Sequence, residues 1–147
     1  MLMPSFTSGR RIAGVAETAK RRVLVIDDAS LVRLYYRNAL ERAGYAVDEA
    51  LNGMEALEKL LAEAADLLVV DVNMPQMDGF TFLKILRRQE LPLASTPALV
   101  TSTESGPQDV IAARRAGANF YLVKPVSQEM LTAYAALLCG RAAWTSS

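Results

Sequence analysis

Four short apolar runs in the sequence are each followed directly by residues whose side chains could bind a metal ion or a phosphoryl group. Three carboxylates held close together repel one another, and one pair at about 5 Å with an effective dielectric constant of about 20 costs roughly 3 kcal/mol. A fold that keeps such a cluster therefore needs a cation or a reaction at that place. The residues are Asp27 and Asp28 after the run 23–26, Asp71 after 67–70, Thr101 and Ser102 after 97–100, and Lys124 after 120–123.

The chemical types of these side chains favour a divalent cation and a phosphoryl group as ligands. An all-oxygen donor set with room for water suits Mg²⁺ or Mn²⁺ better than zinc. A cation held by carboxylates can bridge to a phosphoryl group, whose remaining oxygens a lysine and a hydroxyl can bind. Taken singly, the same residues have a structural interpretation, because Asp, Ser and Thr often cap helices or form turns.

The nucleophile of such a reaction must itself be a carboxylate. The chain contains no histidine, which removes the Ser-His-Asp and Cys-His arrangements. Its one cysteine, Cys139, lies in an apolar stretch and is interpreted as an inert helix residue. Formation of an aspartyl phosphate is a recognised covalent route. Neither a P-loop motif nor a dinucleotide-binding glycine fingerprint occurs, so a bound nucleotide is not supported.

The elements that position these residues follow from the alternation of short apolar runs with longer amphipathic stretches. The runs are mostly continuous and rich in β-branched residues, which is typical of parallel strands buried on both faces. The stretches between them have helical spacing, so an α/β fold with a parallel sheet is expected, and ligands bind such sheets at the carboxyl ends of the strands. The predicted strands cover 23–26, 45–50, 67–70, 97–100 and 120–123, and the predicted helices cover about 30–43, 53–64, 79–89, 106–116 and 127–139.

Length and composition fit one folded domain. The chain has 147 residues, 52% of them hydrophobic, and 16 basic residues balance 16 acidic ones. These values exclude a wholly disordered chain and a strongly basic nucleic-acid binder. Residues 1–22 hold five basic residues and one acidic residue, so the remainder of the chain is acidic. We predict a flexible basic arm over 1–21, a folded domain over 22–139 and a loose tail over 140–147.

The sequence also predicts a cytoplasmic location. A single cysteine permits no disulfide within the chain, which fits a reducing compartment. No apolar run approaches the roughly 18 residues that a membrane span needs. The first residues lack the apolar region of a signal peptide.

Four motifs, in this order, resemble the receiver domain of two-component response regulators, the CheY-like family. They are VLVIDDAS, LLVVDVNMPQMDGF, ALVTS and AGANFYLVKP, and the resemblance covers about residues 22–139. It implies a doubly wound, flavodoxin-like (βα)5 fold with a five-stranded parallel sheet in the order 2-1-3-4-5. None of the core motif positions departs from the family pattern.

The resemblance also implies a role for each residue of the site. Asp71 is the phosphoacceptor. Asp28, Asp71 and the backbone carbonyl of Asn73 coordinate Mg²⁺ or Mn²⁺, and Asp27 acts mainly through water. Thr101, with Ser102 beside it, hydrogen-bonds the phosphoryl group, and Lys124 forms an ion pair with the phosphoryl group or with Asp71. Tyr121 resembles the aromatic switch residue that turns inward as the threonine moves, and the Lys124-Pro125 bond resembles the cis peptide of the family.

These roles imply phosphorylation-dependent signalling. We expect a stand-alone response regulator that catalyses only its own phosphorylation and dephosphorylation, because only eight residues follow Cys139. A histidine kinase would phosphorylate Asp71, and a target protein would contact a face formed by the fourth helix, fifth strand and fifth helix, including Val110, Arg114 and Tyr121. Neither nucleic acid nor membrane is an expected partner, and a homodimer is compatible with the resemblance.

Two other functions use the same residues. The first is a phosphorelay shuttle that passes the phosphoryl group to a histidine phosphotransfer protein. The second, less favoured, is a Mg²⁺-dependent phosphatase with an aspartate nucleophile. Such phosphatases carry that nucleophile in a DxD run after the first strand, where this chain has Asp27 and Asp28 side by side.

Overall fold

The structure, a computed structural model, describes residues 20–140. The predicted arm over 1–21 and the predicted tail over 140–147 lie outside this range, apart from residues 20, 21 and 140. No helix among the described residues is long and apolar enough to cross a membrane.

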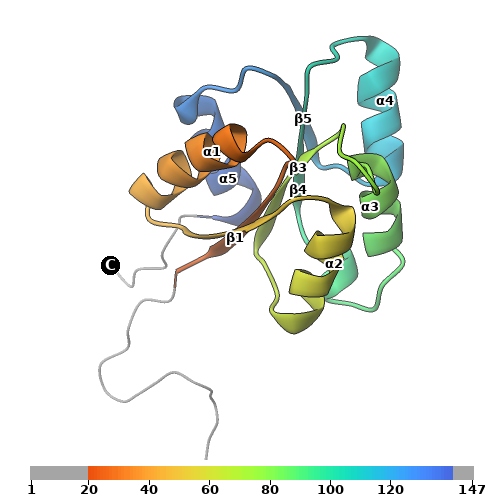
Figure 1. The fold of residues 1–147 in the computed structure, drawn as a ribbon, viewed down its shortest axis with the longest axis horizontal. Coiled ribbons are helices and arrows are strands. Elements are labelled where there is room, and N and C mark those ends of the chain that lie inside the picture. The colour runs from red at the N-terminus through yellow and green to blue at the C-terminus, as the bar shows by residue number, and fades with distance from the viewer. Residues whose placement is uncertain (1–19, 141–147) are drawn as a thin grey trace, which may run out of the picture.

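Five parallel strands form one sheet in the order β2-β1-β3-β4-β5, which confirms the predicted fold class (Figure 1). Because β1 and β3 lie in the middle, polar residues that follow them meet at one edge of the sheet. The strands are β1 (Arg22–Ile26), β2 (Ala46–Ala50), β3 (Leu67–Asp71), β4 (Ala98–Ser102) and β5 (Phe120–Val123).

Five α-helices connect the strands and cover both faces of the sheet. In Figure 1, α1 and α5 lie on one side of the sheet, and α2, α3 and α4 lie on the other. The helices are α1 (Ser30–Arg42), α2 (Gly53–Ala62), α3 (Gly79–Leu86), α4 (Pro107–Ala116) and α5 (Gln128–Cys139), and a short 3₁₀ helix, Leu93–Ser95, precedes β4.

Two hydrophobic clusters, one on each face of the sheet, form the core. Alternate residues of a strand point to opposite faces, so Val23 and Val25 pack with α1 and α5, whereas Leu24 and Ile26 pack with α2 and α3. β3 is buried along its whole length. The edge strands differ from the predicted two-sided burial, because β2 is half-buried at most positions and Phe120 of β5 is exposed.

Several predicted helix boundaries were too long at the carboxyl end. α3 ends at Leu86 rather than near 89, because Arg88 and Gln89 donate to carbonyls three residues back, which tightens the last turn. The Arg87 side chain instead donates to the carbonyls of Gly117, Ala94 and Thr96. α2 ends at Ala62, and Leu61, which has the spacing of a core residue, is exposed.

Candidate functional site

The carboxyl ends of the strands bring three carboxylates together at one rim of the sheet. Asp27 directly follows β1, and Asp71 is the last residue of β3. One carboxylate oxygen from each of Asp27, Asp28 and Asp71 lies within 4.8 Å of the others. The sheet register places Thr101 of β4 beside Asp71. The structure thus gathers residues that lie up to 74 positions apart in the sequence.

Lys124 supplies the positive charge at this rim. Its Nζ donates to Asp71 Oδ1 at 2.9 Å and to Asp27 Oδ2 at 3.0 Å. Both carboxylates are almost fully buried, whereas Asp28 is exposed. One ammonium group therefore stands between two buried carboxylates, and the third carboxylate faces solvent.

The pKa values at the rim reflect this shortage of positive charge. Burial raises the pKa of Asp71, and although the hydrogen bond from Lys124 lowers it, the charges of Asp27 and Asp28 act in the same direction as burial. Burial would lower the pKa of Lys124, but the hydrogen bonds to Asp71 and Asp27 outweigh it and raise the pKa. The ammonium stays protonated, and the ionised form of Asp71 is the strained one.

Backbone groups hold Asp27 in place. Its N–H donates to the Ala50 carbonyl at 3.1 Å, and its Oδ1 accepts from the Ala29 N–H at 2.9 Å. The Arg33 guanidinium donates to the Asp27 carbonyl oxygen at 2.7 Å. This contact of Arg33 was not predicted from the sequence, because a spacing of six residues after Asp27 carries no signal for it.

The two hydroxyls lie within β4, which continues to Ser102 and does not end at Val100 as predicted. Both residues are buried. Ser102 Oγ accepts from the Glu104 N–H at 3.0 Å, so its lone pairs serve the loop that follows the strand. Thr101 Oγ1 is buried and makes no hydrogen bond of ordinary geometry with the described residues, although the Tyr36 hydroxyl lies beside it. A buried hydroxyl without a partner costs about 1–3 kcal/mol, and a ligand with acceptor oxygens would remove that cost.

Tyr121 and the loop after β4 are linked. The Tyr121 hydroxyl donates to the Glu104 carbonyl at 2.7 Å, and the side chain is half-buried. A cavity of about 210 Å³ beside it is lined by residues of α4 and β5, including Val110 and Arg114. The ring is therefore fixed to the β4–α4 loop by one hydrogen bond.

The remaining predicted site residues lie in loops at the same rim. Asn73 is exposed in the β3–α3 loop. The Lys124-Pro125 peptide bond is cis, as predicted. Gly79 shapes the β3–α3 loop, because a Cβ at this position would lie 2.3 Å from the Asp71 carbonyl oxygen. The Gly79 N–H donates to the Val72 carbonyl at 2.9 Å, so α3 begins in close contact with the end of β3.

The donor set fits a small, hard divalent cation. Carboxylate oxygens are the ligands that Mg²⁺ prefers, usually with several retained waters. Only one oxygen of Asp71 and one of Asp27 bind Lys124, and the exposed Asp28 lets water reach the cluster. Asp27, Asp28 and Asp71 could hold such an ion, and the chemistry of the set argues against zinc.

The response regulator receiver domain model matches residues 23–136. Chemotaxis protein CheY1 of Helicobacter pylori is 41% identical over 112 residues, which cover 75% of this chain and 90% of that protein. The protein-glutamate methylesterase/protein-glutamine glutaminase of Archaeoglobus fulgidus is 42% identical over 106 residues, covering 71% of this chain and 30% of that protein.

Solved structures give the same similarity. Chemotaxis protein CheY4 of Vibrio cholerae has a TM-score of 0.77 and 36% sequence identity, covering 82% of this chain and 99% of the other. A putative response regulator from Chloroflexus aurantiacus has a TM-score of 0.78 and 32% identity, covering 84% of this chain and all (100%) of the other.

Proposed function

Because this chain belongs to the response regulator receiver domain family, we propose that it accepts a phosphoryl group on Asp71 from a histidine kinase. The observation that carries the proposal is the Asp71 carboxylate itself. It ends the central strand β3, it is held by Lys124 through Oδ1, and no described residue donates a hydrogen bond to Oδ2. One oxygen is thereby positioned and the other is left to attack.

The proposed step exchanges one bond to phosphorus for another. Asp71 Oδ2 attacks the phosphorus atom of a phosphohistidine, an acyl phosphate bond forms, and the bond between phosphorus and the imidazole nitrogen breaks with its electrons staying on nitrogen. Lys124 keeps its proton throughout and offsets negative charge at Oδ1 and on the transferring group. A Mg²⁺ ion bound by Asp27, Asp28 and Asp71 would draw the phosphoryl oxygens toward the site and offset their charge.

Thr101 and Tyr121 would transmit the change. An acceptor oxygen on Asp71 gives the buried Thr101 hydroxyl the partner that it lacks. Movement of Thr101 alters the space available to Tyr121, whose hydroxyl now bonds the Glu104 carbonyl. We propose that this changes the affinity of the α4–β5–α5 face for a target protein. The chemistry stays confined to gain and loss of the chain's own phosphoryl group.

Incubation with a small acyl phosphate and Mg²⁺, followed by intact-mass measurement, tests the assignment. The wild type should gain one phosphoryl group, and Asp71→Asn should gain none. Asp66→Asn is the matched control, because Asp66 lies just before the same strand at its other end and accepts from the Arg22 N–H. Equal incorporation in wild type and Asp71→Asn would overturn the assignment.

A transfer assay separates output from relay. Phosphorylated protein mixed with a histidine phosphotransfer domain should keep its phosphoryl group if its task is to bind a target. Rapid transfer to that domain would favour the shuttle function instead.

A further inference from the structure

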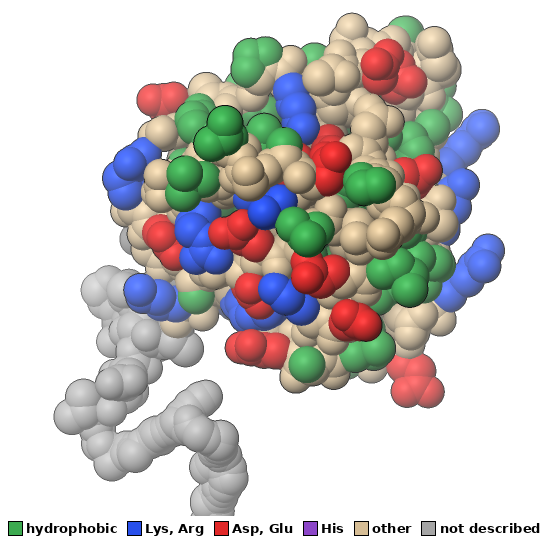
Figure 2. Space-filling model, in the orientation of Figure 1, with side chains coloured by type: hydrophobic (Ala, Val, Ile, Leu, Met, Phe, Trp, Pro, Cys, Tyr) green, Lys and Arg blue, Asp and Glu red, His purple; other side chains and the backbone are tan. Residues whose placement is uncertain are grey.

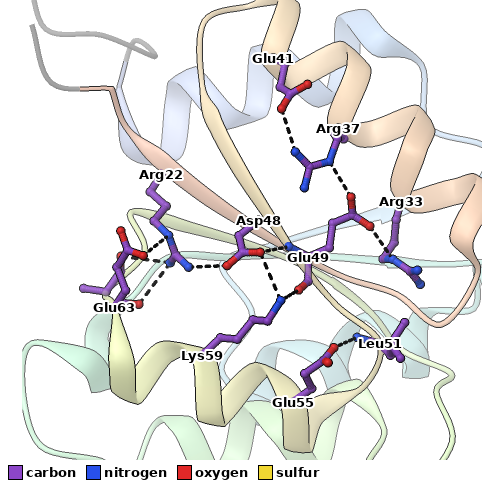
Figure 3. Close-up of polar contacts among 11 residues, drawn as sticks. Arg22, Arg33, Arg37, Glu41, Asp48, Glu49, Leu51, Glu55, Lys59 and Glu63 are labelled. Carbon is purple, nitrogen blue, oxygen red and sulfur yellow. Dashed lines mark hydrogen bonds and ion pairs between the residues drawn. The ribbon is translucent and has the colours of Figure 1, made fainter.

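Charged side chains on both sides of β2 form two chains of ion pairs (Figure 3). Asp48 and Glu49 are neighbours in the strand, so their side chains point to opposite faces. We call the first chain of ion pairs the α2 network, and it is made of Arg22, Asp48, Lys59 and Glu63. We call the second the α1 network, and it is made of Arg33, Arg37, Glu41 and Glu49. In Figure 2, basic and acidic side chains accordingly alternate on the surface between α1 and α2.

One contact links the α1 network, but not the α2 network, to the acidic cluster. Arg33 Nε donates to Glu49 Oε1 at 2.7 Å, and its Nη1 donates to the carbonyl oxygen of Asp27, also at 2.7 Å. The Arg33 side chain is 12% exposed. Arg22 of the α2 network has a side chain that is 13% exposed, and it also donates to backbone carbonyls. These carbonyls belong to Glu63 and Ala64, far from the rim. Arg33 alone among the eight residues touches the acidic cluster.

We propose that Arg33 is a positioning residue for the cation site, held in place by Glu49 and Arg37. This inference rests on the proposed function only in taking the site to bind Mg²⁺. Arg33 fixes the carbonyl that begins the peptide link between Asp27 and Asp28, and thereby sets the direction of the Asp28 carboxylate.

The Asp28 carboxylate depends on this peptide because nothing else holds it. Asp28 is exposed, and no described residue donates a hydrogen bond to its side chain. Asp27 is held through its side chain by Lys124 and Ala29, and Asp71 by Lys124. Of the three carboxylates, Asp28 is therefore the one whose position relies on the backbone alone.

The other residues of the α1 network keep the Arg33 guanidinium in place. Glu49 accepts from Arg33 through Oε1 and from Arg37 through Oε2, and Arg37 also donates to Glu41 Oε2 at 2.8 Å. Glu49 thus binds two guanidinium groups, one on each oxygen. Because Glu49 is anchored on both sides, the Arg33 side chain has little freedom to leave the Asp27 carbonyl.

A purely electrostatic role of Arg33 predicts the opposite result for cation binding. Removal of a positive charge near three carboxylates would tighten Mg²⁺ binding. Removal of a positioning contact would weaken it, as loss of groups that orient metal ligands typically does. The sign of the change in Mg²⁺ affinity of an Arg33 variant therefore separates the two explanations.

Thermal unfolding of the full chain at a series of Mg²⁺ concentrations measures the affinity without a phosphoryl donor. We expect Arg33→Met to raise the Mg²⁺ dissociation constant about tenfold. Arg33→Lys, which keeps the charge but cannot hold both partners in the same fork geometry, should also weaken binding. Arg22→Met, the matched control, should lower the melting temperature of the metal-free protein and leave the dissociation constant within about twofold of wild type, because Arg22 does not touch the site.

Unchanged or tighter Mg²⁺ binding in Arg33→Met would overturn the proposal, as would an equal loss in Arg22→Met. Glu49→Gln provides a second variant that keeps the side-chain shape, and it should weaken Mg²⁺ binding less than Arg33→Met. With the small acyl phosphate, Arg33→Met should need about tenfold more Mg²⁺ for half-maximal phosphorylation and reach a nearly wild-type rate at saturating Mg²⁺. If Asp71→Asn gains as much phosphoryl group as the wild type while Arg33→Met binds Mg²⁺ more weakly, the assignment of Asp71 as the phosphoacceptor is wrong. The positioning role of Arg33 is then still supported.

Discussion

The acidic rim and the two ion-pair chains beside β2 are both rich in charge, but they balance that charge differently. At the rim, the ammonium of Lys124 pairs with Asp27 and Asp71, and Asp28 has no cationic partner among the described residues. Beside β2, four cationic side chains face four carboxylates, and every one of the eight has a partner of opposite sign. The ion-pair chains satisfy themselves, whereas the rim carries an excess of negative charge.

The pKa values of the carboxylates show the same contrast. Burial raises the pKa of Asp71, helped by its like-charged neighbours. Burial would also raise the pKa of Glu49, but hydrogen bonds from Arg37 and Arg33 outweigh it and lower the pKa. Ionisation of Asp71 thus destabilises the fold, whereas ionisation of Glu49 stabilises it. Paired charges at this density indicate a structural role, and unpaired like charges indicate a ligand.

The largest expected effect comes from removing a lysine from each region. Lys124→Met leaves two nearly buried carboxylates without a counter-charge, so we expect the metal-free protein to lose about 3 kcal/mol of unfolding free energy. Lys59→Met removes a lysine that is 37% exposed and bound to Asp48 at 3.2 Å, so we expect a loss below about 1 kcal/mol. Urea unfolding of both variants checks this. Similar losses in the two variants would remove the distinction between the regions.

Mg²⁺ should stabilise the protein through the rim. A ligand at ten times its dissociation constant adds about 1.4 kcal/mol, which corresponds to a rise of about 5 °C in melting temperature for a domain of this size. Asp28→Asn should make the metal-free protein more stable, because one repelling charge is gone, and should reduce the response to Mg²⁺. Asp48→Asn, in the α2 network, should leave the stabilisation by Mg²⁺ unchanged. A melting curve of the wild type that does not respond to Mg²⁺ would contradict the assignment of a shared cation site.

The smallest effect in each region should appear in the pH dependence of stability. The pKa of Asp71 is raised in the folded state above its ordinary value of 3.8, so the metal-free protein loses stability as the pH rises through the range above 3.8. The pKa of Glu49 is lowered below its ordinary value of 4.5, so its contribution is present above pH 4.5 and is lost as the pH falls through the lowered value.

The corresponding variants separate these two contributions. The stability advantage of Asp71→Asn over wild type should grow from pH 4 to pH 7, and the disadvantage of Glu49→Gln should shrink below pH 4.5. Denaturant unfolding in chelator-treated buffer at several pH values measures both. If the unfolding free energies of the two variants changed with pH in the same way, ionisation of Asp71 and ionisation of Glu49 would affect stability in the same direction.

The strands and the grouping of Asp27, Asp28, Asp71 and Lys124 could be predicted from the sequence, because continuous apolar runs mark parallel strands and polar residues end them. The order of the strands was implied only by the resemblance to the receiver-domain family. It did not allow the exposure of Phe120 or the continuation of β4 through Ser102 to be predicted. A hydroxyl in a strand and one in a loop look alike in sequence, and the burial of an edge strand depends on which neighbours cover it.

The contact of Arg33 with Asp27 and the ion pairs beside β2 could not be predicted either. Glu49 lies 16 residues from Arg33 and 12 from Arg37, and nothing in the spacing of these charges shows that α1 lays its guanidinium groups against β2. Such pairs depend on how a helix is rotated over the sheet. Short-range periodicity does not fix that rotation to within one side chain.

The guanidinium of Arg87 anchors the carboxyl end of α4. It binds the Gly117 carbonyl at the carboxyl end of α4 and, through the carbonyls of Ala94 and Thr96, ties that end to the segment before β4. The opposite end of α4 adjoins the exposed residues 103–105 of the β4–α4 loop. A ten-residue helix is about 15 Å long, so a tilt of about 4° about the Arg87 contact would move the amino end of α4 by about 1 Å and leave its carboxyl end in place. The carboxyl end of α4 is therefore the end that we expect to move least, and the end that follows the β4–α4 loop is the end that we expect to move most.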